Sequence, residues 1–424
     1  MASATHRAIE AVWRIESARL IAGLTRVTGD VGAAEELAQD ALVVALERWP
    51  EAGLPEKPGA WLMATAKNKA IDRIRRQATL QRKEAELAHE FSIQQGLELD
   101  APTDVDDQIG DDLLSLMFIA CHPVLPTEAR VALTLRLLGG LTTADIARAF
   151  LTSESTVAQR IVRAKRTLAE SQVRFEVPQG EEFSARVGSV LEVIYLIFNE
   201  GYAATSGDDW VRPELCEDAL RLGRILAELL PAESEVHGLV ALMEIQASRL
   251  RARVGRNGEP IVLLDQNRSR WDQLLIRRGL AALARAERLG RGDGSYQLQA
   301  AIAACHARVM DPAATDWDQI VRLYDRLLVV AGTPVVRLNR AVAVGMASGP
   351  EAGLALVDEL VNEPALASYH LLPSVRGHLL EKLGRTQEAR LEFERAASLT
   401  ENVAERTLLL TRASTRATGK PMHG

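Results

Sequence analysis

Two short segments near residue 150 carry the side chains best suited to reading a nucleic acid. Apolar residues recur with helical spacing over 143–150 and again over 153–166, with about three residues between the two segments. Ser153 is a good N-cap for the second segment. The packed faces would be formed by Ile146, Ala147, Val157 and Ile161. This pattern predicts a helix-turn-helix.

The second of these helices would present polar side chains outward. They are Ser155, Thr156, Gln159, Arg160 and Arg163. Such side chains hydrogen-bond base edges or phosphates when a helix lies in the major groove. A solvated, Arg-rich helix in an all-α protein explains the pattern equally well, so the residues alone leave both interpretations open.

Residues 61–76 form a second basic segment. Between residues 67 and 83, seven Lys or Arg residues accompany a single acid, Asp72. Met63, Ala70, Ile71 and Ile74 can face a core, which leaves Lys67, Asn68, Arg75 and Arg76 largely on another side. Lys and Arg neutralise phosphates without reading sequence, whereas an Asn amide can pair with an accessible base edge. A charge run is usually just a solvated face, and that alternative also stays open.

The elements that must position these side chains are all helical. The chain has 424 residues, 47% hydrophobic and 4% aromatic, with a net charge of −7 and no sustained period-two pattern. We therefore predict an all-α fold without a sheet. Residues 49–59 should form a loop between two helices, because their X-Pro steps and glycines interrupt a helix. Residues 84–112 contain ten acids and no Lys or Arg, which predicts a tether.

Residues 180–424 form a long Leu/Ala-rich helical region whose last part looks repetitive. Glu351-Ala352 and Glu388-Ala389 occupy matching places 37 residues apart, which favours helix pairs of the tetratricopeptide type. Three polar and aromatic motifs precede the repeats, at 199–202, 207–210 and 264–272. Their charged residues, among them Asp208, Asp265 and Arg268, are expected to form capped loops and surface ion pairs.

Several kinds of chemistry find no support in the sequence. The three cysteines, Cys121, Cys216 and Cys305, show neither disulfide nor zinc spacing. We find no nucleophile motif or phosphate-cradling glycine loop, so we expect no enzyme activity, no metal and no cofactor. No export signal or membrane anchor is apparent, and the expected location is the cytoplasm.

The order of these segments resembles the extracytoplasmic-function sigma factors of bacterial RNA polymerase. A helix over 32–49, the Pro/Gly loop, residues 61–76, a linker and the helix-turn-helix follow one another as in that family. The resemblance implies region 2 at 1–83, a linker at 84–112, region 4 at 113–175, and no region 3. It covers about 170 residues; the helical region 180–424 looks like the extension of one subgroup.

The resemblance also implies site residues. Core polymerase would dock on Glu35, Glu36, Leu37, Gln39 and Asp40. The −10 element of the promoter would contact Trp61, Lys67, Asn68, Arg73, Arg75 and Arg76, with Asn68 near a flipped base enclosed by the loop at 54–58. The −35 element would contact Ser155, Thr156, Gln159, Arg160, Arg163, Lys165 and Arg166. The expected partners are therefore core RNA polymerase and promoter DNA, with a protein or intramolecular partner for the C-terminal helices and no membrane.

One position departs from the usual motif. Many helix-turn-helix turns contain glycine, whereas this chain has Leu151-Thr152. The turn therefore either avoids a positive φ or is strained.

A different class of protein stays possible. A helix-turn-helix regulator with a helical sensor domain would act on preformed polymerase and would not need the helix at 32–49 or the basic segment. An enzyme housed in residues 180–424 is a third possibility, for which no motif speaks.

Overall fold

The computed structural model describes residues 4–85, 105–256, 258–290 and 292–414, with the backbone alone for residues 4, 72–85 and 105–109. The described residues are almost entirely helical, which confirms the all-α class. One parallel pair of two-residue strands, β1 (Ser206–Gly207) and β2 (Glu401–Asn402), was not predicted. The chain divides into two compact units, Met1–Val193 and Ile194–Gly424, and each is described by itself.

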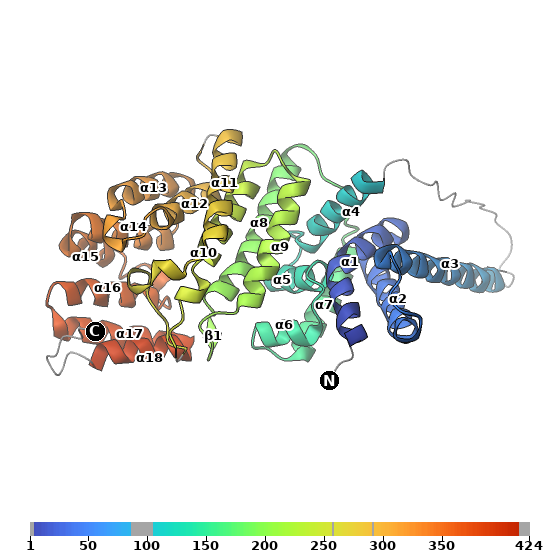
Figure 1. Ribbon diagram of the computed structural model, residues 1–424, viewed down its shortest axis with the longest axis horizontal. Coiled ribbons are helices and arrows are strands. Elements are labelled where there is room, and N and C mark those ends of the chain that lie inside the picture. The colour runs from blue at the N-terminus through green and yellow to red at the C-terminus, as the bar shows by residue number, and fades with distance from the viewer. Residues whose placement is uncertain (1–3, 86–104, 257, 291, 415–424) are drawn as a thin grey trace. The chain divides into compact units, whose positions relative to one another are not determined.

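Unit 1 contains seven complete helices within its described residues (Figure 1). They are α1 (Ala4–Thr28), α2 (Val31–Ala52), α3 (Pro58–Ala85), α4 (Val105–Ala120), α5 (Thr127–Leu137), α6 (Thr143–Ala149) and α7 (Glu154–Glu170); α8 (Gly180–Tyr202) begins in this unit. The first three pack on one another. On α2, fully buried alanines recur every three or four residues, at Ala34, Ala38, Ala41 and Ala45. Such a stripe of small residues lets neighbouring helices approach closely.

The predicted loop at 49–59 is shorter than expected. Helix α2 continues through Pro50 to Ala52, and α3 begins at Pro58. Pro50 lies in the last turn, where it costs the helix one hydrogen bond. The backbone N–H of Gly53, with φ +82°, still donates to the Trp49 carbonyl at 3.0 Å and ends the helix. The prediction that residues 49–52 leave the helix was wrong.

The acidic segment also ends earlier than predicted. Its last eight residues, 105–112, form the first two turns of α4. Asp112 pairs there with Arg26 of α1, with 3.0 Å between Oδ2 and Nε. Residues 86–104, on which the rest of the predicted tether depends, lie outside the described residues.

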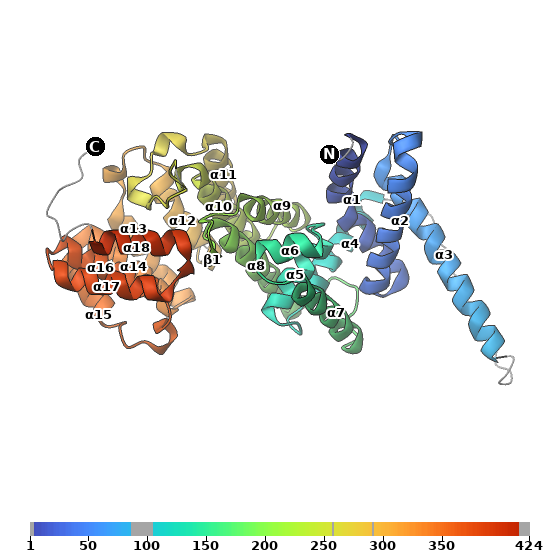
Figure 2. The ribbon, with the colours of Figure 1, turned by 90° about the horizontal axis from the view of Figure 1, so that it is seen from below.

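Unit 2 holds the end of α8, ten further α-helices of the described chain and five short 3-10 helices. The ten α-helices are α9 (Pro213–Leu229), α10 (Ser234–Ala247), α11 (Gln273–Leu289), α12 (Ser295–Ala307), α13 (Trp317–Val330), α14 (Pro334–Ser348), α15 (Pro350–Asp358), α16 (Leu371–Lys382), α17 (Thr386–Leu399) and α18 (Val403–Ser414). From α9 to α18, each helix packs on the next one in sequence, and Figures 1 and 2 show α16, α17 and α18 side by side. Glu351 and Glu388 both lie in the first turn of the second helix of a pair, as repeats require. The tetratricopeptide type itself stays a prediction.

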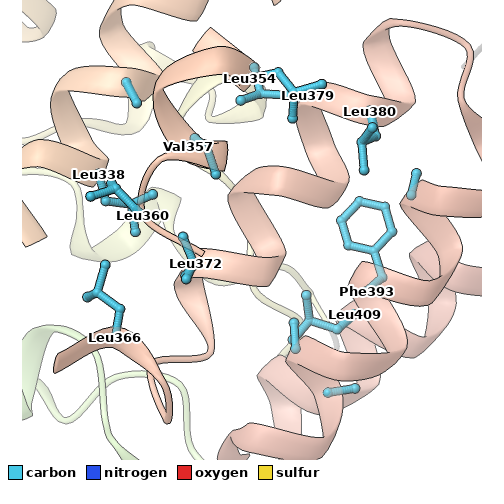
Figure 3. Close-up of a cluster of buried hydrophobic side chains, with 14 residues drawn as sticks. Leu338, Leu354, Val357, Leu360, Leu366, Leu372, Leu379, Leu380, Phe393 and Leu409 are labelled. Atoms are coloured by element: carbon cyan, nitrogen blue, oxygen red, sulfur yellow. The ribbon is translucent and has the colours of Figure 1, made fainter. Parts of the chain in front are cut away.

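The core of the last helices is built from leucines around one phenylalanine (Figure 3). Phe393 of α17 is 1% exposed, and it faces Gly377 of α16 so closely that a Cβ at residue 377 would lie 3.0 Å from the ring. The glycine therefore lets the two helices cross over the aromatic ring.

The strand pair joins the beginning of unit 2 to its end. Ser206 pairs with Glu401 and Gly207 with Asn402. The fully buried Asn402 side chain donates from Nδ2 to the carbonyls of Ala204, at 3.1 Å, and Asp209, at 2.9 Å. The turn after α8 is thus fixed by a residue almost two hundred positions later.

Candidate nucleic-acid interface

The helix-turn-helix forms as predicted from α6 and α7. The Thr142 hydroxyl accepts from the Asp145 N–H, and the Asp145 carboxylate accepts from the Thr142 N–H, both at 3.1 Å. Ser153 Oγ accepts from the Thr156 N–H at 3.1 Å, which confirms the predicted N-cap. The packed side chains Ile146, Ala147, Val157 and Ile161 are all buried, as expected. Both helix starts are therefore fixed by side-chain caps and held by a common core.

The outward face of α7 separates into engaged and unengaged side chains. The engaged groups are Ser155 and Thr156, which bond to Ser153 Oγ at 2.9 and 2.6 Å, Arg166, which pairs with Glu170 at 2.9 Å, and Lys165, which pairs with Glu35. Within the described chain, Gln159, Arg160 and Arg163 make no side-chain hydrogen bond or ion pair. Gln159 and Arg163 are exposed and Arg160 is half-buried. These three side chains have their polar ends available to a ligand.

The turn before α7 takes the strained alternative. Leu151 has φ +46°, and its side chain is 54% exposed. An L-residue with a Cβ in this region pays roughly 1–2 kcal/mol, and burial of this side chain does not offset that cost.

Leu151→Gly is expected to stabilise the helix-turn-helix by about 1 kcal/mol, since glycine adopts positive φ freely and loses only part of the gain to its larger unfolded-state entropy. Amide hydrogen exchange of α6 and α7 in the full chain should slow accordingly. Thr152→Gly is the matched control, because Thr152 does not have a positive φ. In this variant, amide hydrogen exchange of α6 and α7 should become faster. Faster exchange in both variants would show that the Leu151 conformation carries no strain.

The predicted −10 residues lie on α3. Trp61 packs edge-to-face on the buried Trp49, with 5.2 Å between ring centres. Asn68 is exposed and Lys67 half-buried, and the preceding loop exposes 44% of Leu54. The side chains of Arg73, Arg75 and Arg76 lie outside the described residues. The exposed amide of Asn68 and the half-buried Lys67 therefore lie in the N-terminal half of α3, directly after the loop that exposes Leu54.

The predicted polymerase-docking residues do not form one exposed face on α2. Glu36 and Asp40 are exposed, and Asp40 lies 3.9 Å from Lys69. Leu37 belongs to the core at 3% exposure. Gln39 is half-buried and donates to Glu35 Oε1 at 2.6 Å.

Glu35 lies in an ion-pair cluster between α2 and the helix-turn-helix segment. It is 4% exposed and pairs with Arg136 of α5 at 2.6 Å and with Lys165 of α7. Burial by itself raises the pKa of Glu35, but Lys165 and then Arg136 outweigh it and hold the pKa below its usual value. The contact is therefore complete above the ordinary glutamate pKa of about 4.3 and is lost only as the pH falls through the lowered value.

Sequence analysis missed the apolar part of this surface. A groove of about 400 Å³ runs beside Glu35, with walls that include Ile9, Trp13, Leu42, Val43, Leu46 and Leu141. Val43 and Leu46 are partly exposed apolar side chains on α2. The run of apolar residues 42–44 is the signal that could have identified them, because it covers more of the helix than one buried stripe requires.

Among the described residues, no group of three or more His, Cys, Asp or Glu side chains could hold a metal ion. In the same part of the chain, no helix combines the length and the apolar character needed to cross a lipid bilayer.

The chain thus presents a helix-turn-helix in the same unit as a helical bundle whose helix α3 carries the basic segment. Comparison with known proteins identifies its family. Sigma-70 region 2 matches residues 15–79, sigma-70 region 4 matches residues 115–168, and a family of unknown function (DUF6596) matches residues 186–287. The chain belongs to the sigma-70 family, as an extracytoplasmic-function-type sigma factor with a C-terminal extension.

Individual relatives are similar to this chain over different lengths. An uncharacterized protein of Rhizobium meliloti strain 1021 is 43% identical over 387 residues, which is 90% of this chain and 89% of that protein. A probable ECF RNA polymerase sigma factor SigI of Mycobacterium tuberculosis, in strains H37Rv and CDC 1551, is 27% identical over 175 residues, or 41% of this chain and 58% of that protein. No solved structure matches the chain.

Proposed function

We propose that this protein binds core RNA polymerase and directs initiation at specific promoters, with α7 reading the −35 element and α3 with its preceding loop reading the −10 element. The observation that carries the proposal is the set of unengaged side chains on α7. Gln159, Arg160 and Arg163 stand on a helix whose start is capped and whose inner face is buried. Arg pairs with guanine and Gln with adenine in the major groove.

At the −10 element, Asn68 supplies the base-reading amide and Lys67 a phosphate contact. A base taken out of the stack needs compensating contacts, because unstacking costs a few kcal/mol. The exposed Leu54 loop and the Trp49–Trp61 pair lie next to this segment and support such a pocket. Arg73, Arg75 and Arg76 add positive charge that attracts the phosphates of the DNA backbone.

Docking on core polymerase uses α2, through Glu36, Asp40 and the exposed Val43 and Leu46. Glu35 cannot take part while it pairs with Arg136 and Lys165. We infer that docking also engages Glu35, so the Glu35 contact must break when the chain binds polymerase. The conformation in which Glu35 pairs with Arg136 and Lys165 is called the closed conformation.

The remaining assignments belong to the same proposal. Residues 1–83 act as region 2, 84–112 as linker, 113–175 as region 4, and 180–424 as a regulatory extension. The protein acts in the cytoplasm, without enzymatic activity and without a cofactor. Its helical extension binds a protein or another part of the chain.

Reconstituted transcription tests the proposal. Purified chain is added to core polymerase lacking any sigma factor, and run-off transcripts from genomic fragments are sequenced. Discrete transcripts that depend on the chain are expected. Stimulation only of a preformed holoenzyme would instead identify the helix-turn-helix regulator, and would contradict the sigma assignment.

Arg160→Ala and Arg163→Ala are each expected to weaken binding of −35 duplex DNA by about 1–3 kcal/mol, and to relax specificity at one base position for a base contact. Arg166→Ala is the matched control on the same helix, because Arg166 already pairs with Glu170. We expect it to change affinity less, and without altering base preference. Competition binding with single-base variants of the selected site measures both effects. If all three variants lost the same amount of binding free energy, the outward face of α7 would contact DNA through its positive charge alone and would not read bases.

A further inference from the structure

Three arginines alternate with aromatic rings in unit 2. The Cζ of Arg253 lies 3.8 Å from the centre of the Tyr202 ring, and that of Arg249 lies 5.6 Å from the same ring. Arg249 is also 5.7 Å from Trp271, which in turn lies 5.1 Å from Arg268. The guanidinium groups are therefore gathered in one place, although like charges repel.

Tyr202, Arg268 and Trp271 come from motifs that the sigma assignment leaves unexplained, whereas Arg249 and Arg253 lie between those motifs. Tyr202 ends the motif at 199–202, Trp210 ends the motif at 207–210 and lies 5.2 Å from Arg253, and the motif at 264–272 supplies Arg268. The expectation of a surface ion pair at Arg268 was wrong, because Arg268 is only 3% exposed. The motifs meet at a partly buried cluster, which we call the arginine cluster: Tyr202, Trp210, Arg249, Arg253, Arg268 and Trp271.

No carboxylate of the described residues forms an ion pair with these arginines. The side chain of Arg249, a residue at 8% exposure, makes neither a hydrogen bond nor an ion pair with any described residue. Arg268 donates to the carbonyls of His306 and Val309, both at 2.8 Å. Elsewhere in the unit, by contrast, Arg212 pairs with Glu200 and Arg224 with Glu244.

Several buried donors around the cluster also lack a partner. They are the Nε atoms of Arg249, Arg253 and Arg268 and the indole Nε1 atoms of Trp210 and Trp271. Buried N–H groups are nearly always hydrogen-bonded in native proteins, and charged ones most of all. Burial and the neighbouring Arg249 and Arg268 lower the pKa of His306 to about 4, so that its ring adds no charge at neutral pH. The cluster thus combines three positive charges with five unsatisfied donors.

We propose that the arginine cluster binds a small phosphate-bearing molecule, whose oxygens accept from the unpaired donors and whose negative charge replaces the missing carboxylates. This goes beyond the sigma-factor assignment and makes the extension a receptor for an anionic small molecule. A phosphate group suits the cluster better than one carboxylate, since it carries up to two negative charges and three acceptor oxygens. The flat aromatic faces, already covered by guanidinium groups, keep those groups in place.

Calorimetric titration of the full chain with inorganic phosphate tests this proposal, at constant ionic strength and in a buffer without other multivalent anions. One phosphate is expected per chain, with a dissociation constant in the millimolar range or below. Arg249→Met should weaken binding at least tenfold, and in phosphate-free buffer it should leave the thermal midpoint unchanged or raised. Arg277→Met, on the exposed face of α11, is the matched control and should bind as the unmodified chain does.

A second readout uses the unmodified chain, so the test survives if Arg249→Met does not fold. Phosphate close to His306 should shift the ring resonances of that histidine and raise its pKa. Three results would each overturn the proposal: no saturable binding of phosphate, binding by Arg249→Met that is as tight as that of the unmodified chain, or His306 resonances that phosphate does not shift.

Comparison of anions identifies the source of the phosphate group. Phenyl phosphate that binds at least tenfold more tightly than inorganic phosphate would assign the cluster to an organic phosphate ester; equal affinities would assign it to the free ion. Acetate that binds as tightly as phosphate would contradict the proposal. None of these binding measurements requires polymerase, so a failure of the phosphate proposal is distinguishable from a failure of the sigma assignment.

Discussion

Removing the two cations that hold Glu35 is expected to increase the affinity of the free chain for core RNA polymerase at least tenfold. Arg136→Ala with Lys165→Ala leaves Glu35 buried without a partner in the closed conformation, a situation that costs about 3–5 kcal/mol in a buried pair and less here, because Arg136 and Lys165 are each 22% exposed. The closed conformation then loses population, and apparent affinity rises with the fraction of competent protein.

The experiment measures binding to core polymerase without DNA, since Lys165 is also a proposed −35 contact. Arg148→Ala is the control, because it removes one positive charge from the same region. Among the described residues, Arg148 pairs only with Asp145 of its own helix, so the affinity of this variant for core polymerase should not change. A double variant that binds core polymerase no better than the Arg148→Ala chain would show that the Glu35 contact does not compete with docking.

The second large effect concerns where the chain can be shortened. A fragment ending at residue 178 is expected to lose at least about 3 kcal/mol of unfolding free energy relative to a fragment ending at residue 193. The first turns of α8 bond to unit 1: Arg130 donates to Ser189 at 2.8 Å and to Glu192 at 2.9 Å, and Phe118 packs on Phe183 at 5.9 Å. Charge-assisted hydrogen bonds contribute about 1.5–3 kcal/mol each, and an aromatic pair about 1 kcal/mol.

Urea unfolding of the two fragments, followed by circular dichroism, measures this difference. Arg130→Ala in the longer fragment is the matched control, because it removes the bonds to α8 while keeping the helix, and it should reproduce about half of the loss. Equal stability of both fragments would show that unit 1 does not depend on α8. The domain limit predicted near residue 180 is thereby tested as well.

Sequence patterns predicted what depends on near neighbours. The N-cap at Ser153 and the buried Ile146 and Val157 follow from spacings of three or four residues, which are the same in any α-helix. The all-α class follows from repetition of that signal along the chain. At Pro50 the same kind of rule failed, because a proline in a last turn removes one bond without preventing the turn.

Long-range contacts could not be predicted in this way. Glu35 and Lys165 are 130 positions apart, and nothing in the amphipathic pattern of either helix distinguishes an exposed charge from a paired one. The convergence of Tyr202, Arg249 and Arg268 could not be predicted for the same reason, since these residues are tens of positions apart in the sequence.

The strand pair of Gly207 with Asn402 sets the order in which the extension can mature on the ribosome. The carbonyls of Ala204 and Asp209 leave the exit tunnel long before the amide that binds them is synthesised. In the nascent chain, the turn after α8 therefore stays without these hydrogen bonds until Asn402 has been synthesised, and translation that stops before residue 402 yields a protein in which the two carbonyls lack this donor.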